Sequence, residues 1–89
     1  MTVHPQDIEQ VRQLATQLRL RAAALEENVS QVTTAIRAVN WTGAEASKFK
    51  SDWFDTHLPE AQAVIATMRA GSEAAAADAA EAATRVPSR

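Results

Sequence analysis

The sequence predicts an all-α protein: an antiparallel helix-turn-helix hairpin that dimerises into a four-helix bundle. Apolar residues recur at heptad spacing through most of the chain, and one short glycine-containing link interrupts them near its middle. Of the 41 apolar residues among 89, 20 are alanine, which buries little surface. The 21 larger ones make a thin core for a lone domain of this size, so we expect a partner or self-association.

The first helix is expected over about residues 5–39. Pro5 suits the first helical position, where its missing N–H leaves no hydrogen bond unmade. Counting heptads from Ile8, apolar residues fill every a and d position, namely Ile8, Val11, Ala15, Leu18, Ala22, Leu25, Val29, Val32, Ile36 and Val39. This pattern is typical of a helix that packs along its whole length against another helix.

A turn is expected at about residues 40–43. Thr42 is followed three residues later by Glu45, the spacing of a capping box that opens a second helix. Gly43 allows the backbone to approach closely. A connection of a few residues places the two helices antiparallel.

The second helix is expected over about residues 44–85, followed by a flexible tail at 86–89. Its apolar stripe slips by one residue near Pro59, whose ring clashes with the carbonyl of Asp55, so we expect a kink near 55–59. After Gly71 the chain is nearly all alanine, with high helix propensity and little expected burial.

The tip of the hairpin carries more aromatic surface than two helices can enclose, because Trp41, Phe49, Trp53 and Phe54 all lie near it. A second hairpin closing over this region would bury the rings. The residues expected in the core and dimer interface are Val11, Leu18, Leu25, Val32, Phe49, Trp53, Phe54, Leu58, Ile65 and Met68.

Several classes of function are disfavoured by composition. A net charge of −2 argues against nucleic-acid binding, and the absence of cysteine excludes disulfides and thiol catalysis. His57 has carboxylates nearby, but the second histidine, His4, is expected at the far end of the hairpin, so neither a metal site nor a cofactor is expected, and no residue set suggests an enzyme. Membrane binding is not expected, and the N-terminus lacks the pattern of a signal peptide.

Trp41-Thr42-Gly43, placed in a tight link between two long amphipathic helices, resembles the motif of the WXG family, the early secreted antigenic target group of small type VII (ESX) secretion proteins. Phe49, Trp53, Leu58 and Pro59 are similar to an aromatic-then-Leu-Pro stretch of actinobacterial members. The resemblance implies a homodimer or heterodimer with another WXG-type hairpin, exported folded and without a cleaved signal peptide. It also implies that Trp41 and Gly43 are presented to the secretion machinery in addition to packing at the turn; the alternative is that they only pack the turn.

Many members also carry a C-terminal Tyr-x-x-x-Asp/Glu export signal. This chain has no tyrosine, although Asp78 and Glu81 supply acidic residues for a possible tail signal. Three functions stay open. The protein is secreted or co-secreted as a dimer, or it is a cytoplasmic adaptor that escorts a larger exported protein to the secretion ATPase, or it is a coiled-coil assembly module unrelated to secretion.

Overall fold

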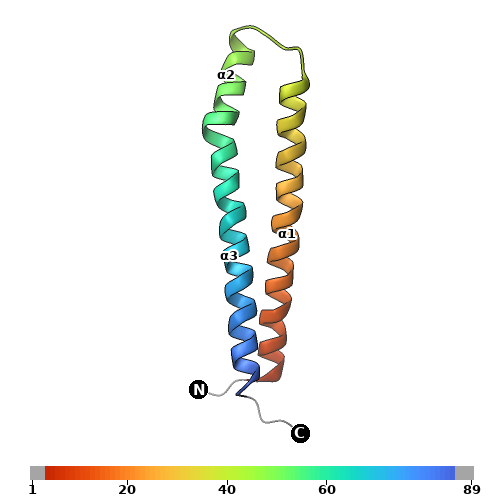
Figure 1. Cartoon of the computed structure of the whole chain (residues 1–89), viewed down its shortest axis with the longest axis vertical. Coiled ribbons are helices and arrows are strands. Elements are labelled where there is room, and N and C mark those ends of the chain that lie inside the picture. The colour runs from red at the N-terminus through yellow and green to blue at the C-terminus, as the bar shows by residue number, and fades with distance from the viewer. Residues whose placement is uncertain (1–3, 86–89) are drawn as a thin grey trace.

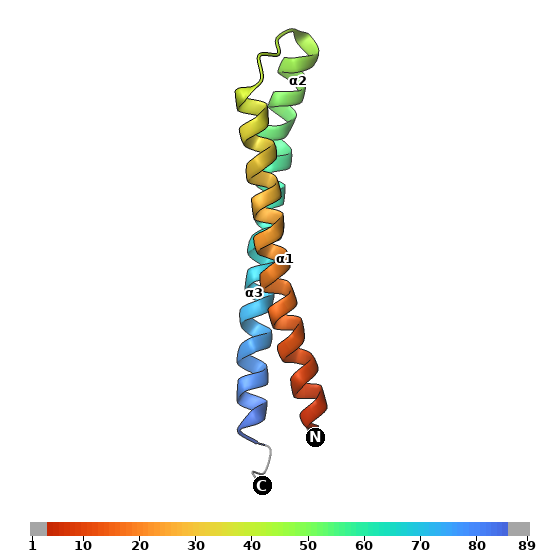
Figure 2. The same cartoon turned by 90° about the vertical axis from the view of Figure 1, so that its right-hand side faces the viewer.

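A computed structural model describes residues 4–85. Helix α1 (Pro5–Ala38) is followed by a second helical rod made of α2 (Ala44–Asp52), the π-helical turn η1 (Trp53–His57) and α3 (Leu58–Ala83). The second rod runs back along α1, as two perpendicular views show (Figures 1 and 2). Between residues 4 and 85 there is no β-strand. The predicted all-helical hairpin is confirmed.

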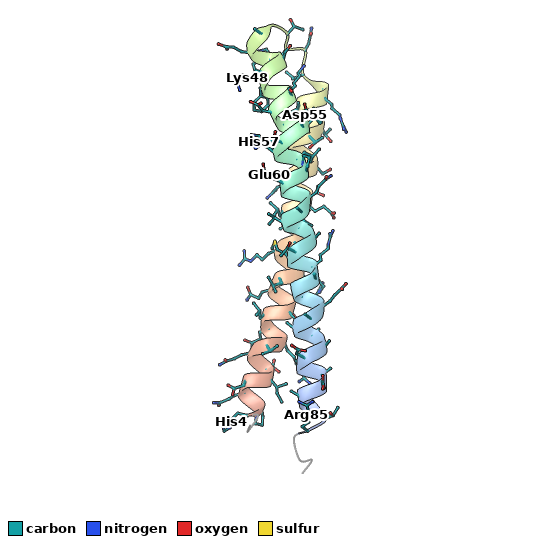
Figure 3. The ribbon with its side chains drawn as sticks, turned by 90° about the vertical axis from the view of Figure 1, so that its left-hand side faces the viewer. His4, Lys48, Asp55, His57, Glu60 and Arg85 are labelled. Carbon is teal, nitrogen blue, oxygen red and sulfur yellow. The ribbon has the colours of Figure 1, made fainter. Side chains whose placement is uncertain are left out.

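The hairpin is a thin rod. Its extents are 68 × 19 × 13 Å and its radius of gyration is 19.7 Å, against about 12 Å for a compact domain of this length. His4 and Arg85 lie at one end, opposite the α1–α2 connection (Figure 3). A rod two helices wide has no interior where a large side chain can be enclosed on every side. Among the described residues, no large side chain is fully buried.

Helix α1 turns its a positions toward α3. Four of the five expected a residues are buried, namely Ile8, Ala15, Ala22 and Ile36. The d residues Val11, Leu18 and Leu25 are half-buried, whereas Val32 and Val39 are exposed. The helix ends at Ala38, and Val39 adopts an extended conformation. The buried strip is therefore narrower than the heptad pattern predicted, because a single opposing helix covers the a positions and only the near edge of the d positions.

The predicted capping box at Thr42 and Glu45 is wrong. Gly43 is the N-cap of α2, and its carbonyl accepts a hydrogen bond from the N–H of Ser47. With Gly43 as N-cap, Thr42 lies outside the helix, and no side chain caps α2. Gly43 has a φ of 115°, a conformation that side-chain-bearing residues rarely adopt. The glycine therefore sets the start of the second rod through its backbone.

The expected kink near Pro59 takes the form of a π-helical turn, η1, and the helical rod continues through it. The N–H of Leu58 bonds to the carbonyl of Trp53, five residues back, which inserts one extra residue into the helix. Pro59 has no N–H, and its ring would collide with the carbonyl of Asp55 in a regular α-helix. The wider turn accommodates the proline and absorbs the one-residue slip in the apolar stripe.

The alanine-rich half of α3 packs closely against α1, contrary to the expectation that it builds little core. Ser72 is buried and its hydroxyl donates a hydrogen bond of 2.6 Å to the carbonyl of Ala15. Ala79 is also buried. A methyl group built on Gly71 would lie 3.4 Å from Cδ1 of Leu18. Small side chains at these positions let the two helices approach closely. These residues are therefore buried because α1 and α3 are close together, and not because their side chains are large.

Candidate functional site

One side of the hairpin carries a largely apolar strip, called the apolar face below, which Arg21 and Asn28 interrupt at two g positions of α1. It is formed by d and g positions of both helices, which are Val11, Leu14, Leu18, Leu25 and Val32 on α1 with Val64, Met68 and Ala75 on α3. The a residues point at the opposing helix, so d and g side chains lie on one flank and e side chains on the other. Because the helices are antiparallel, their d and g flanks fall on the same side.

Contacts between the helices support this assignment. Gly71, a g residue of α3, lies against Leu18, a d residue of α1. Near the termini a hollow of about 180 Å³ is lined by d, a and g residues of both helices, which are Asp7, Ile8, Val11, Asp78, Ala79 and Ala82. The apolar face thus extends along the shared flank of α1 and α3.

The apolar face is exposed to an unusual degree. Leu14 is 52% exposed, Val64 51% and Val32 42%. Leu18, Leu25 and Met68 are half-buried, with the rest of each side chain in solvent. Exposed apolar residues that stand alone are ordinary, but several of them on one side of two neighbouring helices indicate an interaction surface.

Two aromatic rings are exposed at the tip. Trp41 and Phe49 are 42% and 45% exposed, and their ring centroids lie 5.8 Å apart at a tilt of 48°. The ammonium group of Lys50 donates a hydrogen bond of 3.0 Å to the carbonyl of Trp41, which ties the turn to α2. Trp41 and Gly43 therefore lie at an exposed tip, which is hydrogen-bonded to α2 and which the single hairpin does not cover.

Two consecutive residues of η1, Trp53 and Phe54, reach α1. The indole N–H of Trp53 donates a hydrogen bond of 3.1 Å to the hydroxyl oxygen of Thr33, and the guanidinium carbon of Arg37 lies 5.1 Å from the centroid of the Phe54 ring. Both rings are half-buried, and Thr33 is buried. Sequence reasoning identified the two aromatics but missed Thr33 and Arg37, because both are polar residues outside the heptad stripe.

The opposite flank, called the polar face, carries an ion pair between the helices. The guanidinium of Arg69 donates two hydrogen bonds to the carboxylate of Glu26, at 2.8 and 3.0 Å. This hydrogen bonding, reinforced by the positive charge, holds the pKa of Glu26 below its ordinary value and raises that of Arg69. The pair joins the e positions of α1 and α3.

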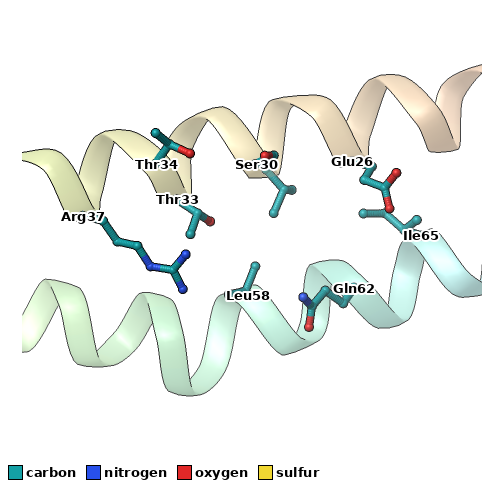
Figure 4. Close-up of a pocket in the computed structure, with 9 residues that line it drawn as sticks. Glu26, Ser30, Thr33, Thr34, Arg37, Leu58, Gln62 and Ile65 are labelled. Atoms are coloured by element: carbon teal, nitrogen blue, oxygen red, sulfur yellow. The ribbon is translucent and has the colours of Figure 1, made fainter.

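A groove of about 310 Å³ runs along the polar face between the Glu26–Arg69 pair and η1 (Figure 4). Its floor is aliphatic, with Leu58 pointing from α3 toward α1, and its walls carry hydroxyl, amide and charged groups. The lining residues are Glu26, Val29, Ser30, Thr33, Thr34, Arg37, Leu58, Gln62 and Ile65. The side chain of Arg37 reaches across the space between the helices at one end (Figure 4).

The remaining polar candidates are dispersed. His57, Asp55 and Glu60 are exposed around η1 (Figure 3), and Asp52 forms an ion pair of 2.7 Å with Lys48. The hydrogen bond from Lys48 holds the pKa of Asp52 below its ordinary value. From residue 4 to residue 85, no three His, Asp or Glu side chains are grouped to hold a metal ion. Within the same range, no helix is both long and apolar enough to cross a bilayer.

The predicted tail residues Asp78 and Glu81 are exposed within α3 and are not part of an extended tail. The expected flexible tail at 86–89 lies outside the described residues. Comparison with protein families, with curated proteins and with solved structures finds no match for this chain.

Proposed function

We propose that this protein acts through helix–helix association, pairing its apolar face with that of a second helical hairpin to form a four-helix bundle. The observation that carries the proposal is the surface that one hairpin leaves exposed. The chain exposes 6710 Å², whereas a folded monomer of 9.6 kDa exposes about 5,100 Å².

The excess amounts to about 1,600 Å² for each chain. This is about twice the 800 Å² that a standard-size interface buries on each partner, and it falls in the range of obligate dimers, which bury about 1,000–2,500 Å² on each partner. Covering the strip from Leu14 to Val32 together with Val64 and Met68 would enclose side chains that the hairpin leaves half in solvent. Dimerisation supplies the core that the rod lacks.

The distribution of charge along the hairpin favours an antiparallel arrangement of two copies. Among the described residues, the end at His4 and Arg85 is acidic, with Arg12 and Arg85 against five acidic residues, which are Asp7, Glu9, Glu73, Asp78 and Glu81. A parallel pairing would place two acidic ends together. An antiparallel pairing places each acidic end beside the other copy's tip, where Lys48 and Lys50 offset two of the three carboxylates of Glu45, Asp52 and Asp55.

We place this module in a type VII (ESX) secretion system, as a small non-enzymatic protein secreted or co-secreted as a dimer. The resemblance of Trp41-Thr42-Gly43 to the WXG motif supports this placement, as does the position of that motif at an exposed tip. The alternative is a cytoplasmic adaptor that pairs with the helical N-terminal region of a larger exported protein such as a toxin. The lack of tyrosine favours this alternative, because the partner would then supply the export signal.

Light scattering coupled to size exclusion tests the association. The wild-type chain should elute with a mass near 19 kDa, twice the 9.6 kDa of one chain. Val64→Glu should give a 9.6 kDa species, because it places a charge in the interface. Leu20→Glu is the matched control: Leu20 is 54% exposed, close to the 51% of Val64, but lies on the outer side of α1. A monomeric wild type, or equal masses for both variants, would contradict pairing through the apolar face.

The location of the untagged protein in its native host distinguishes the secreted dimer from the cytoplasmic adaptor. Appearance in the culture medium that depends on the secretion ATPase supports the secreted dimer. Retention in the cells in a complex with a larger protein, captured through wild type but not through Val64→Glu, supports the adaptor.

A further inference from the structure

We propose that the groove on the polar face binds an acidic segment of a partner protein, with a carboxylate on Arg37 and an aliphatic side chain on the groove floor. The groove lies on the flank opposite the apolar face, so it stays open when a second hairpin covers that face. The site therefore goes beyond the proposed association and would let the assembled bundle take a further protein.

Arg37 is prepared to bind an anion. Its guanidinium carbon lies over the Phe54 ring, 5.1 Å from the centroid, and no carboxylate between residues 4 and 85 forms an ion pair with it. The aromatic ring does not use the N–H donors of the guanidinium, and a guanidinium can bind a carboxylate through two hydrogen bonds. Phe54 is itself positioned by η1, whose neighbouring residue Trp53 is hydrogen-bonded to Thr33.

The rest of the groove suits a short peptide. Leu58 and Ile65 form an aliphatic floor for one large apolar side chain, while Ser30, Thr34 and Gln62 offer hydrogen-bonding groups to a peptide backbone. From Arg37 to Glu26 the groove follows α1 for about 16 Å, the length of about five extended residues.

The two ends of the groove differ in charge, which gives the bound segment a direction. At one end the carboxylate of Glu26 is engaged by Arg69. At the other end Arg37 offers a positive charge without a carboxylate partner among the described residues. An acidic side chain on the segment would therefore lie at the Arg37 end, and the apolar side chain would point toward Ile65.

The test uses two blocked peptides, acetyl-Gly-Leu-Glu-Leu-Gly-amide and its glutamine analogue, titrated into the ¹⁵N-labelled full-length chain. We expect shifts of the Trp53 indole and of amides around Thr34 and Gln62. The glutamine peptide should bind about three- to fivefold more weakly, as for an exposed ion pair. Arg37→Gln should remove this preference, whereas Arg37→Lys should retain part of it.

Arg19→Gln is the matched control, since Arg19 is an exposed arginine on the same flank of α1, about 27 Å from Arg37. It should bind the glutamate peptide as wild type does. Equal affinity for the two peptides, an unchanged preference in Arg37→Gln, or shifts centred on Val64 and Met68 would overturn the proposal. The mass of each sample is measured alongside, so a monomeric chain that still prefers the glutamate peptide would contradict the dimer and not the groove.

Discussion

The indole nitrogen of Trp53 lies 3.1 Å from the hydroxyl oxygen of Thr33, and this hydrogen bond fixes how η1 sits against α1. The ring of the next residue, Phe54, lies beneath the guanidinium of Arg37, one helical turn beyond Thr33. In a regular α-helix two consecutive side chains point about 100° apart. The wider π-helical turn brings both rings to α1, so η1 determines the register of the hairpin near its tip.

Replacing Thr33 by valine should destabilise the hairpin by about 1 kcal/mol, because the half-buried indole N–H of Trp53 loses its partner while the packing volume is nearly kept. Urea unfolding at fixed protein concentration measures the change. Thr34→Val is the control, since Thr34 is an exposed neighbour on the same helix. A Thr33→Val variant as stable as Thr34→Val would show that the hydrogen bond contributes nothing to folding.

The fold could be predicted because its signals are periodic. Heptad spacing through α1, the glycine link and Pro59 led to a hairpin with a break near 55–59, and the structure places Gly43 at the start of α2 and η1 at Trp53–His57. The capping box was wrong because its spacing is a local signal, and the backbone freedom of Gly43 moved the helix start by one residue. The heptad stripe of the second helix includes Ser72, but its hydrogen bond to the Ala15 carbonyl could not be foreseen, since this bond depends on how closely two helices approach.

The site was predicted only in its apolar part. Leu18, Leu25 and Met68 stand out as large residues in an apolar stripe, but the stripe does not reveal which edge a single opposing helix leaves exposed. Thr33 and Arg37 gave no sequence signal, because their roles depend on rings that arrive from the other helix across η1.

Helices α1 and α3 pack closely at Ala22, so a larger side chain at this position should lower the free energy of unfolding. Ala22 has no exposed surface in the hairpin, so Ala22→Leu must push α3 away or force strained rotamers. We expect a loss of about 1–3 kcal/mol in the free energy of unfolding. Ala23→Leu adds the same atoms at an exposed neighbouring position and should change stability by less than about 0.5 kcal/mol. Equal effects in urea unfolding would contradict the close approach of α1 and α3.

The Glu26–Arg69 pair predicts a pH dependence. Arg69 holds the pKa of Glu26 below its ordinary value of 4.5, first by hydrogen bonding and then by charge. A carboxyl group with a lower pKa in the folded state contributes stability above pH 4.5, and that contribution is lost as the pH falls through the folded-state value. The Tm of wild type should exceed that of Glu26→Gln slightly at pH 7, and the difference should shrink toward pH 3. A difference that stays constant over this range would show that the pair adds no stability.

If η1 is one residue inserted into an otherwise regular helix, removing one residue there should restore the helix without changing the pairing on either side. The deletion of Thr56, an exposed residue of η1, is combined with Pro59→Ala so that no proline ring clashes with the restored helix. This variant should keep the helical content of wild type and lose about 1 kcal/mol in the free energy of unfolding, the contribution of the Arg37–Phe54 contact.

The control deletes the exposed Ala66 in the same Pro59→Ala background. This deletion rotates the two halves of α3 by about 100° relative to each other. Ile65, before the deletion, and the buried Ser72 and Ala79, after it, then cannot all face α1, and the cost should be on the order of 3 kcal/mol or more. Circular dichroism with thermal unfolding compares the two deletions, and similar losses would show that η1 is not a tolerated insertion.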